Sequence, residues 1–506
     1  MNEFTYQNTV ERWCVFEATV ESPSDKNPFI DYNIKGVFQG KNERVEVDGF
    51  YDGEGKYKVR FMPSFEGDYT FQIYGNFIDK PYRGNFTVTP ASETNHGPVR
   101  VANTYHFAYE DGTPYYSIGT TCYAWTHQKP ELQEKTLETL KNSPFNKIRF
   151  CIFPKHYVYN FNEPFTYPYE GTPCDSSCLT RDNFMDPKIF EGNDWDFKRF
   201  NPRHFQHIEK RIQDLMDLGI EADLIVMHPY DRWGFSKMKP EEDDLYWKYV
   251  IARFSAYRNV WWSLANEYDL MKEKTSQDWE RYASIICEKD PYNHLRSIHN
   301  CTNIYDFTRP WVTHCSIQRV DVYKTAELVD EWRQRYKKPV VLDEICYEGN
   351  IEHGWGNISG QELVRRFWEA ACRGGYAGHG ETYAHPEDIL WWSHGGDLHG
   401  ESPERFKFLH KILCEVPGHG LRRHYLSWDS VTGVPESMTY YGDYYLDYYG
   451  FNRPDFRTFH FDETTKYQVD IIDTWNMTIR DAGVHQGKFT IKLPGREYMA
   501  IRIRKV

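Results

Sequence analysis

Two apolar segments of the chain each end in a polar pair that contains a glutamate. The first segment, Asn259-Val-Trp-Trp-Ser-Leu-Ala-Asn-Glu-Tyr268, ends in Asn266 and Glu267, and the second, Lys338-Pro-Val-Val-Leu-Asp-Glu-Ile-Cys-Tyr347, ends in Asp343 and Glu344. A carboxyl group at the tip of a buried strand is suited to donate a proton, because burial beside aromatic side chains raises its pKa. Two carboxyl groups that flank one glycosidic bond can cleave it, one as acid and base and the other as nucleophile.

Both segments lie in a long region, from about residue 101 to 420, in which strand-like and helix-like patterns alternate. Strands are expected at 115–124, 147–153, 221–228, 260–266, 295–299, 312–318, 340–344 and 376–383. Helices are expected at 131–142, 204–218, 241–257, 277–288, 326–336, 360–373 and 403–413. This alternation predicts an α/β fold, a (β/α)8 TIM barrel, whose strands carry the catalytic residues at their carboxyl ends. The fifth connection, residues 300–311, shows no clear helix.

Short β runs separated by turn residues stand on both sides of this region. They predict two small all-β sandwich domains, so that the chain divides into an N-terminal Ig-like sandwich at 1–92, the barrel at 101–420 and a C-terminal sandwich at 421–506. The C-terminal strands are expected at 437–441, 444–449, 456–461, 468–473, 488–492 and 498–504. The largest barrel insertion, residues 156–196, follows the second strand and is expected to wall the active-site cleft.

Composition narrows the class of partner. The net charge is −14, which makes nucleic acid and anionic membranes poor partners. Aromatic residues make up 17% of the chain, enough to fill cores and also to stack on sugar rings. The N-terminus shows no secretory signal and no apolar run is long enough to span a bilayer, so a cytoplasmic protein with reduced cysteines is expected.

The two glutamates and their neighbours resemble a known group of enzymes. Asn266-Glu267 after the fourth strand and Glu344 after the seventh resemble clan A of the (β/α)8 glycoside hydrolases, and within it the cellulase-like and apiosidase-like families. The segments Val10-Glu-Arg-Trp13 and Tyr51-Asp-Gly-Glu-Gly-Lys-Tyr-Lys-Val-Arg-Phe-Met-Pro63 resemble the Ig-like sandwich often found ahead of such barrels. Phe107-Ala-Tyr-Glu-Asp-Gly-Thr-Pro114 resembles the start of the barrel in the same group, so the resemblance covers most of the chain.

The resemblance implies a role for each matching residue. Glu267 would be the acid/base, Glu344 the nucleophile, and Asn266 the hydrogen-bond partner of the sugar 2-hydroxyl. Arg149 on the second strand would keep the nucleophile ionised, in agreement with the effect of a nearby guanidinium on a carboxyl pKa. His228, at the end of the third strand, matches a position that contacts the sugar.

Polar and aromatic residues at the other strand ends are further candidates for binding the substrate. His299 ends the fifth strand, and Gln318 ends the sixth, where the cellulase-like pattern usually has an aromatic residue or a histidine. Each histidine could equally be a hydrogen-bonded core residue, and each aromatic ring could pack under a loop. The first and eighth strands contribute the remaining candidates, which are Tyr123, Trp125, Glu381, Tyr383 and either Trp391 or Trp392.

Two functions other than hydrolysis by paired carboxylates would suit parts of the sequence. A metal hydrolase would use the histidines near the eighth strand, but the sequence contains no His-Glu-x-x-His and no Cys-x-x-Cys, so neither a metal nor another cofactor is expected. A non-catalytic carbohydrate-binding protein would suit the flanking sandwiches, but it needs neither a nucleophile nor a proton donor.

The sequence therefore predicts a retaining glycoside hydrolase that cleaves an equatorial, β-type bond in an oligosaccharide or glycoside by double displacement, as an exo-acting enzyme. The alternatives that stay open are a non-catalytic binding protein on a glycosidase scaffold and an endo-acting, cellulase-like glycanase. The sugar, the linkage and a possible homo-oligomeric state are not fixed by the sequence.

Overall fold

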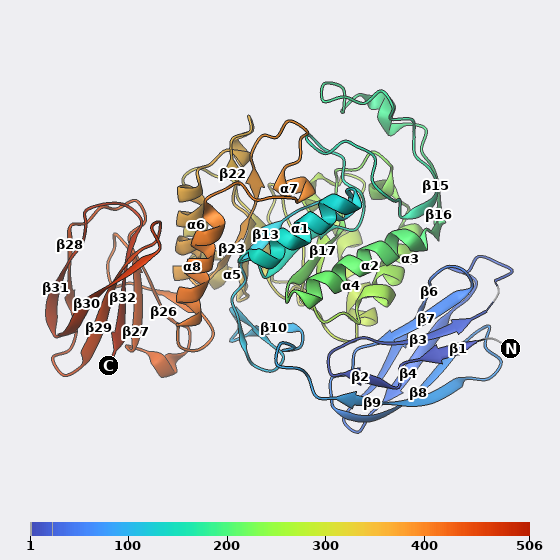
Figure 1. Ribbon diagram of the computed structural model, residues 1–506, viewed down its shortest axis with the longest axis horizontal. Coiled ribbons are helices and arrows are strands. Elements are labelled where there is room, and N and C mark those ends of the chain that lie inside the picture. Colours follow the sequence, from blue (N-terminus) through green and yellow to red (C-terminus); the bar gives the residue numbers. More distant parts are fainter. Residues whose placement is uncertain (1–2, 23) are drawn as a thin grey trace.

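In the computed structural model, which describes residues 3–22 and 24–506, the middle of the chain forms a parallel β-barrel (Figure 1). Each strand of the barrel pairs in parallel with its neighbours, and a bridge between His299 and Ser316 joins the two ends of the sheet. The predicted TIM barrel is thus confirmed. Its strands are β13 (Gly119–Thr121), β14 (Lys147–Cys151), β17 (Glu221–Met227), β18 (Val260–Ala265), β19 (Arg296–Ser297), β20 (Cys315–Gln318), β21 (Val340–Glu344) and β23 (Tyr376–His379).

Helices cover the outside of the barrel. They are α1 (Pro130–Asn142), α2 (Pro202–Asp217), α3 (Pro240–Phe254), α4 (Ser276–Lys289), α5 (Val329–Tyr336), α6 (Gly360–Cys372) and α8 (Ser402–Cys414). A proline at the first turn of α1, α2 and α3 suits a helix start because its φ is already fixed. As expected from the sequence, residues 300–311 between β19 and β20 contain no helix.

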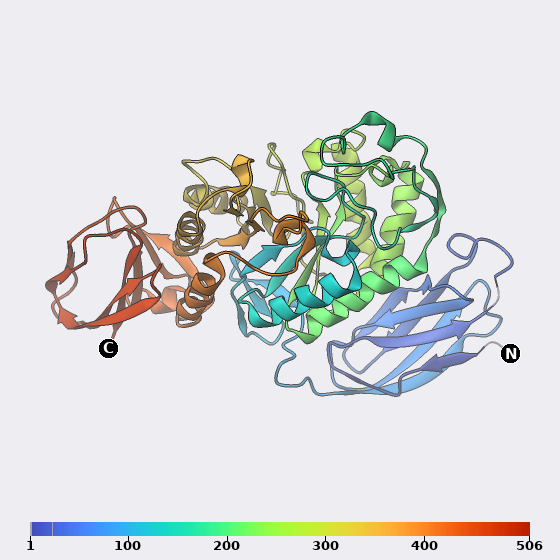
Figure 2. The same ribbon diagram turned by 45° about the horizontal axis from the view of Figure 1, so that its top comes forward.

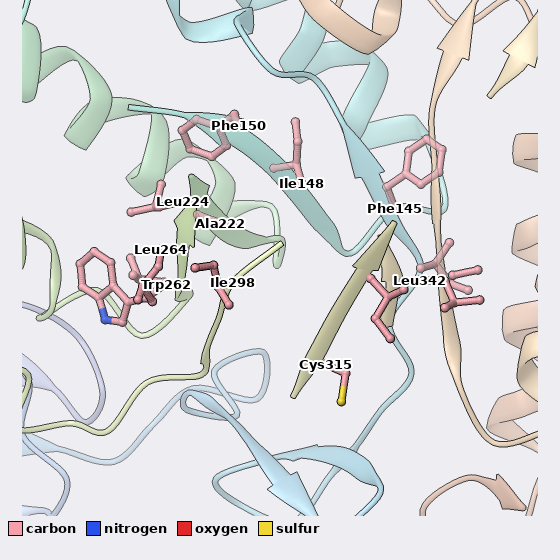
Figure 3. Packing of buried hydrophobic residues seen from close by; sticks show 14 of the residues in the cluster. Phe145, Ile148, Phe150, Ala222, Leu224, Trp262, Leu264, Ile298, Cys315 and Leu342 are labelled. Carbon is pink, nitrogen blue, oxygen red and sulfur yellow. The ribbon is translucent and has the colours of Figure 1, made fainter. Parts of the chain in front are cut away.

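Alternation along the strands separates an apolar outer layer from a polar interior. On β14, Ile148 and Phe150 belong to the apolar cluster between the barrel and its helices, which also contains Ile208 of α2 (Figure 3). The residues that alternate with them, Lys147 and Arg149, are buried on the opposite face, inside the barrel. The outer layer stabilises the barrel, and the interior is left for charged groups.

The N-terminal residues form two sheets that face each other, and all their strand pairs are antiparallel except β2 with β9. One contains β1 (Phe4–Tyr6), β3 (Phe16–Glu21), β7 (Lys56–Phe61) and β6 (Phe50–Tyr51), and the other β2 (Thr9–Glu11), β9 (Tyr82–Thr89), β8 (Gly67–Gly75), β4 (Ile34–Gln39) and β5 (Arg44–Asp48). Stacked phenylalanines, among them Phe16 on Phe86 and Phe38 on Phe61, fill the space between the sheets. This region has an apolar core of its own, which Tyr292 of the barrel region joins, whereas Phe50 of β6 belongs to the core of the barrel.

A three-stranded sheet follows and closes the amino-terminal end of the barrel. It consists of β10 (Val99–Ala102), β11 (His106–Tyr109) and β12 (Pro114–Tyr115). Phe107 and Tyr115 pack with Trp261 of β18 and Val341 of β21 in one apolar cluster. The barrel is therefore plugged at this end, and a substrate has access only from the other.

The C-terminal region lies on the opposite side of the barrel from the N-terminal sandwich (Figures 1 and 2). Its larger sheet has the order β25 (Leu421–His424), β26 (Val431–Pro435), β27 (Tyr444–Tyr448), β32 (Met499–Lys505), β29 (Lys466–Asp473) and β30 (Thr478–Gln486). One face of this sheet contacts α6 and shares the apolar cluster of the barrel, through Leu446 and Tyr448. The smaller sheet is β28 (Phe456–His460) with β31 (Lys488–Lys492).

The predicted strand at 437–441 is wrong. A 3-10 turn, η7 (Met438–Tyr440), stands there, and the Ser437 side chain accepts a hydrogen bond from the amide of Thr439. Met438 and Tyr441 are exposed, so the apolar residues of this segment have no core to pack on. In the part of the chain that the structure describes, no helix has both the length and the apolar character that crossing a membrane requires.

Buried arginines connect the N-terminal sandwich to the barrel. Arg253 of α3 is fully buried and lies 2.7 Å from Asp52 Oδ1 of the sandwich and 2.7 Å from Glu209 Oε2 of α2. Arg60 of β7 donates to the carbonyl of Arg253 at 2.9 Å and also pairs with Glu209. The two carboxylates would be left in an apolar interface without these cations.

Replacing Arg253 with methionine is expected to destabilise the protein by about 3 kcal/mol, because it leaves buried carboxylates with fewer partners. The free energy of unfolding in urea measures this loss. Lys35→Met is the control, since Lys35 pairs with Glu46 on the surface, and it should change stability by less than about 1 kcal/mol. Equal effects of the two substitutions would refute the role assigned to Arg253.

Candidate active site

A pocket of about 290 Å³ lies at the carboxyl ends of the barrel strands. Its wall contains both glutamates identified in the sequence, Glu267 two residues after the end of β18 and Glu344 at the end of β21. Of the other predicted residues, Tyr123, Asn266 and Gln318 also line it. The rest of the wall is formed by Lys155, Tyr157, Tyr230, Leu270, Cys301, Val320, Cys346, Tyr347, Trp355 and Trp392.

Glu344 is surrounded by groups that favour its ionised form. The Tyr123 hydroxyl donates to Glu344 Oε1, His299 Nε2 lies 3.1 Å from that oxygen, and Arg149 Nη1 lies 3.5 Å from it. His299 is at ion-pair distance without the alignment of a hydrogen bond. Burial alone would raise the pKa of Glu344, but His299, Arg149 and Tyr123 together lower it well below its usual range.

A bulge in the sheet allows two successive residues of β21 to face the interior. Ser316 pairs with Val341 and Gln318 pairs with Glu344, so β21 has one more residue than β20 over this stretch. Regular alternation would turn either Asp343 or Glu344 outward. Instead both carboxylates approach Arg149, Asp343 at 3.9 Å from Nε and Glu344 at 3.5 Å from Nη1.

The carboxylate of Asp343 belongs to a buried charge network inside the barrel. Lys147 Nζ lies 2.7 Å from Asp343 Oδ1 and 2.9 Å from Asp223 Oδ2. Although burial raises the pKa of Asp343, Lys147 and Arg149 hold it far below its usual range. Ser316 Oγ donates to Asp343 at 2.5 Å and lies 3.0 Å from His299 Nδ1. The network thus orients the histidine beside Glu344.

Glu267 has the opposite electrostatic environment. Burial and the negative charge of Glu344 raise the pKa of Glu267. Tyr230, Lys155 and His299 lower it, but they offset only part of the rise. The Tyr230 hydroxyl donates to Glu267 Oε2. The backbone of Glu267 is left-handed, with φ of +48°, a conformation that costs a residue other than glycine about 1–3 kcal/mol. Such strain concentrates at functional sites, where the surrounding structure holds it in place.

Asn266 connects the second-strand arginine with the pocket. Its Oδ1 accepts a hydrogen bond from Arg149 Nη2 at 3.2 Å, and the Tyr123 hydroxyl, whose proton points to Glu344, also lies 3.2 Å from this oxygen. With the carbonyl oxygen occupied in this way, the amide NH2 remains as a donor at the pocket wall.

Several predicted substrate-binding residues do not line the pocket. Trp125 is fully buried and packs on Phe150, and Trp391 donates its indole N–H to Thr120 Oγ1 at 2.8 Å. Trp392, the neighbour of Trp391, is the tryptophan that reaches the pocket. Of the two rings that the sequence left open, Trp392 is therefore the one placed to contact a ligand.

The other predicted residues that do not line the pocket make hydrogen bonds inside the protein. His228 Nε2 lies 3.1 Å from the carbonyl oxygen of Phe153. Glu381 accepts from the amides of His399 and Gly400, and burial raises its pKa to about 7. Tyr383 donates to Glu348 at 3.0 Å. These partners lie far away along the chain, so the position at a strand end does not show that these side chains bond inside the protein.

Three pocket residues that the sequence did not indicate lie in loops after predicted barrel strands. Lys155 comes shortly after β14, Tyr230 after β17 and Tyr347 after β21. The only available signal was the rule that loops after barrel strands carry the site. That rule does not say which loop residue turns inward.

Parts of the chain are similar to known protein families. The sequence profile of the cellulase family (glycosyl hydrolase family 5) matches residues 108–289, and two domains of unknown function, DUF5060 and DUF5605, match residues 9–76 and 428–504. No curated protein sequence matched the chain. The endo-1,4-beta-D-mannanase from Thermotoga petrophila RKU-1 shares 15% identity over 52% of this chain and 87% of its own, with a TM-score of 0.35.

Another solved structure matches over almost the whole length. It is a protein from Bacteroides vulgatus ATCC 8482, assigned as a glycoside hydrolase, with 38% sequence identity and a TM-score of 0.91. The match covers 99% of this chain and 100% of that one, including both flanking regions. The chain therefore belongs to the same family and is a glycoside hydrolase, with a barrel of the cellulase (glycosyl hydrolase family 5) type.

Proposed function

We propose that the protein hydrolyses a β-type, equatorial glycosidic bond with net retention, with Glu344 as nucleophile and Glu267 as general acid/base. The observation that carries this proposal is the pair of carboxyl groups in one pocket whose pKa values are shifted in opposite directions. A nucleophile must be ionised and a proton donor must be protonated at the same pH, and the two environments favour these states.

The reaction proceeds in two displacements. In the first, Glu344 attacks the anomeric carbon while Glu267 gives its proton to the departing glycosidic oxygen, so the bond to the leaving group breaks as the glycosyl–Glu344 ester forms. In the second, Glu267, now a carboxylate, takes a proton from water, which attacks the same carbon and releases Glu344. Two inversions give net retention.

Neighbouring side chains support these steps. Arg149 and His299 keep the Glu344 carboxylate ionised, and the Tyr123 hydroxyl orients it. Asn266, whose carbonyl oxygen is occupied by Arg149, directs its amide N–H groups toward the 2-hydroxyl of the sugar. These residues position the reacting groups before the substrate arrives.

The size and walls of the pocket support exo-action on a short oligosaccharide or glycoside. Its volume, about 290 Å³, is at the lower end for ligand pockets. The rings of Tyr157, Trp355 and Trp392 enclose it, and Trp355 packs on Trp392 with ring centroids 4.9 Å apart. An endo-acting enzyme would need a longer cleft. Family membership also favours hydrolysis over the non-catalytic binding that the sequence left open.

Glu344→Ala is expected to lower kcat/KM on the best aryl glycoside of a broad α- and β-panel by at least about 1,000-fold, because the attacking group is removed. Release of the aryl group measures the rate. Glu352→Ala is the matched control, since its carboxylate is 79% exposed and should be dispensable. Undiminished activity in Glu344→Ala would overturn the assignment of the nucleophile.

The stereochemistry of the product tests retention independently of the variants. Proton NMR of the wild-type reaction should show the β-anomer of the released sugar first, before mutarotation. Initial appearance of the α-anomer from a β-glycoside would establish inversion and rule out the covalent intermediate on Glu344.

Tyr230→Phe is expected to move the alkaline limb of the kcat/KM profile upward by about 1 pH unit. The Tyr230 hydroxyl stabilises the ionised Glu267, so its loss raises the pKa of Glu267 and keeps the acid protonated to higher pH. Tyr157→Phe is the control, because Tyr157 lines the same pocket and packs on Tyr230 with centroids 4.7 Å apart. A downward shift, or equal shifts in both variants, would contradict this role.

A further inference from the structure

The pocket contains a buried lysine that the catalytic steps do not use. Lys155 is 3% exposed, and its Nζ lies 3.6 Å from the ring centre of Tyr123, 4.5 Å from that of Tyr230 and 4.6 Å from that of Trp392. Among residues 3–22 and 24–506, no carboxylate lies within 4.0 Å of this ammonium. The cation is thus held by aromatic faces and not by an ion pair.

The negative charges of Glu267 and Glu344 act on this ammonium from a distance, but neither carboxylate forms an ion pair with it. Glu344 is already engaged by Tyr123, His299 and Arg149, and Glu267 by Tyr230. Burial lowers the pKa of Lys155 to about 8, so the ammonium is still charged at neutral pH. A buried cation without an anionic partner is costly, and proteins keep one where it serves binding or catalysis.

Lys155 lies close to the place where the attacked sugar would bind. Its ammonium contacts Tyr123, which bonds the nucleophile, and Tyr230, which bonds the acid. The transition state at this sugar carries positive charge, as an oxocarbenium ion does. An unneutralised ammonium nearby would oppose that charge, whereas a carboxylate on the same sugar would neutralise the ammonium and remove the opposition.

We propose that the glycone is a uronic acid and that Lys155 binds its carboxylate, which makes Lys155 the residue that determines specificity. This inference rests on the proposed function of the same pocket. The single positive charge of the Lys155 ammonium is balanced by the single negative charge of a carboxylate. The described wall of the pocket contains no arginine and no second lysine, the side chains that a phosphate dianion would require in addition.

Binding of free monosaccharides tests the proposal without any turnover. Calorimetry on the wild-type protein would compare glucuronate, galacturonate and mannuronate with the matching neutral hexoses and hexose 6-phosphates. At least one uronate should bind at least about 10-fold more tightly than its neutral hexose. Equal affinities would overturn the proposal, and preference for a 6-phosphate would overturn the assignment to a carboxylate.

Two variants locate the preference at Lys155. Lys155→Met keeps the apolar stem and should abolish the preference for the uronate, whereas Lys155→Arg should retain part of it, because the charge stays. Unfolding midpoints close to that of the wild type would show that both variants fold. A uronate preference that survives in Lys155→Met would overturn the role of this lysine.

Hydrolysis of paired aryl substrates separates this inference from the proposed function. Loss of the ammonium also acts on Glu267 and so affects both substrates, but Lys155→Met should lower kcat/KM on an aryl uronide at least about 30-fold more than on the matching neutral aryl glycoside. Glu344→Ala should lose both activities. If the wild type cleaved neutral glycosides with no preference for uronides while Glu344→Ala cleaved neither, the hydrolytic mechanism would stand and the uronic acid inference would fail.

Discussion

The ion pairs inside the barrel are the constraint on which the rest of the site depends. Lys147 bridges Asp223 and Asp343 at 2.9 and 2.7 Å, so strands β14, β17 and β21 are joined inside the barrel by almost fully buried charges. Removing one member would leave the others buried and unpaired, which is why such a network fixes a geometry even where it adds little net stability. The same network extends through Ser316 to His299, and from there to Glu344.

This arrangement explains how two carboxyl groups in one small pocket acquire different properties. The cationic side chains lie behind Glu344, whereas Glu267 follows the strand end in a left-handed turn, where burial and the charge of Glu344 act on it. Positive charge on one side and low polarity on the other separate the two pKa values. Two residues of the same type can therefore act as nucleophile and as proton donor, because their surroundings differ.

The sequence was sufficient for the parts of the structure that depend on local periodicity. Long apolar strands and amphipathic helices predicted the barrel, and the strand ends marked Glu267 and Glu344. Local periodicity could not place residues whose position depends on distant partners. Glu381 accepts hydrogen bonds from the amides of residues 399 and 400, and the path of a loop brings Lys155 to the pocket. The strand expected at 437–441 failed for a related reason, since its apolar residues meet no second sheet.

The two flanking regions differ in how they are joined to the barrel, and this difference bears on how the protein could have been assembled in evolution. The N-terminal sandwich has a core of its own and meets the barrel through buried ion pairs and a few aromatic contacts, such as Phe50 with Tyr249. The C-terminal sheet, in contrast, continues the apolar core of the barrel through Leu446 and Tyr448 against α6. A gene fragment ending near residue 420 would therefore encode a barrel with an open hydrophobic flank, so recombination can exchange the first region more readily than the last.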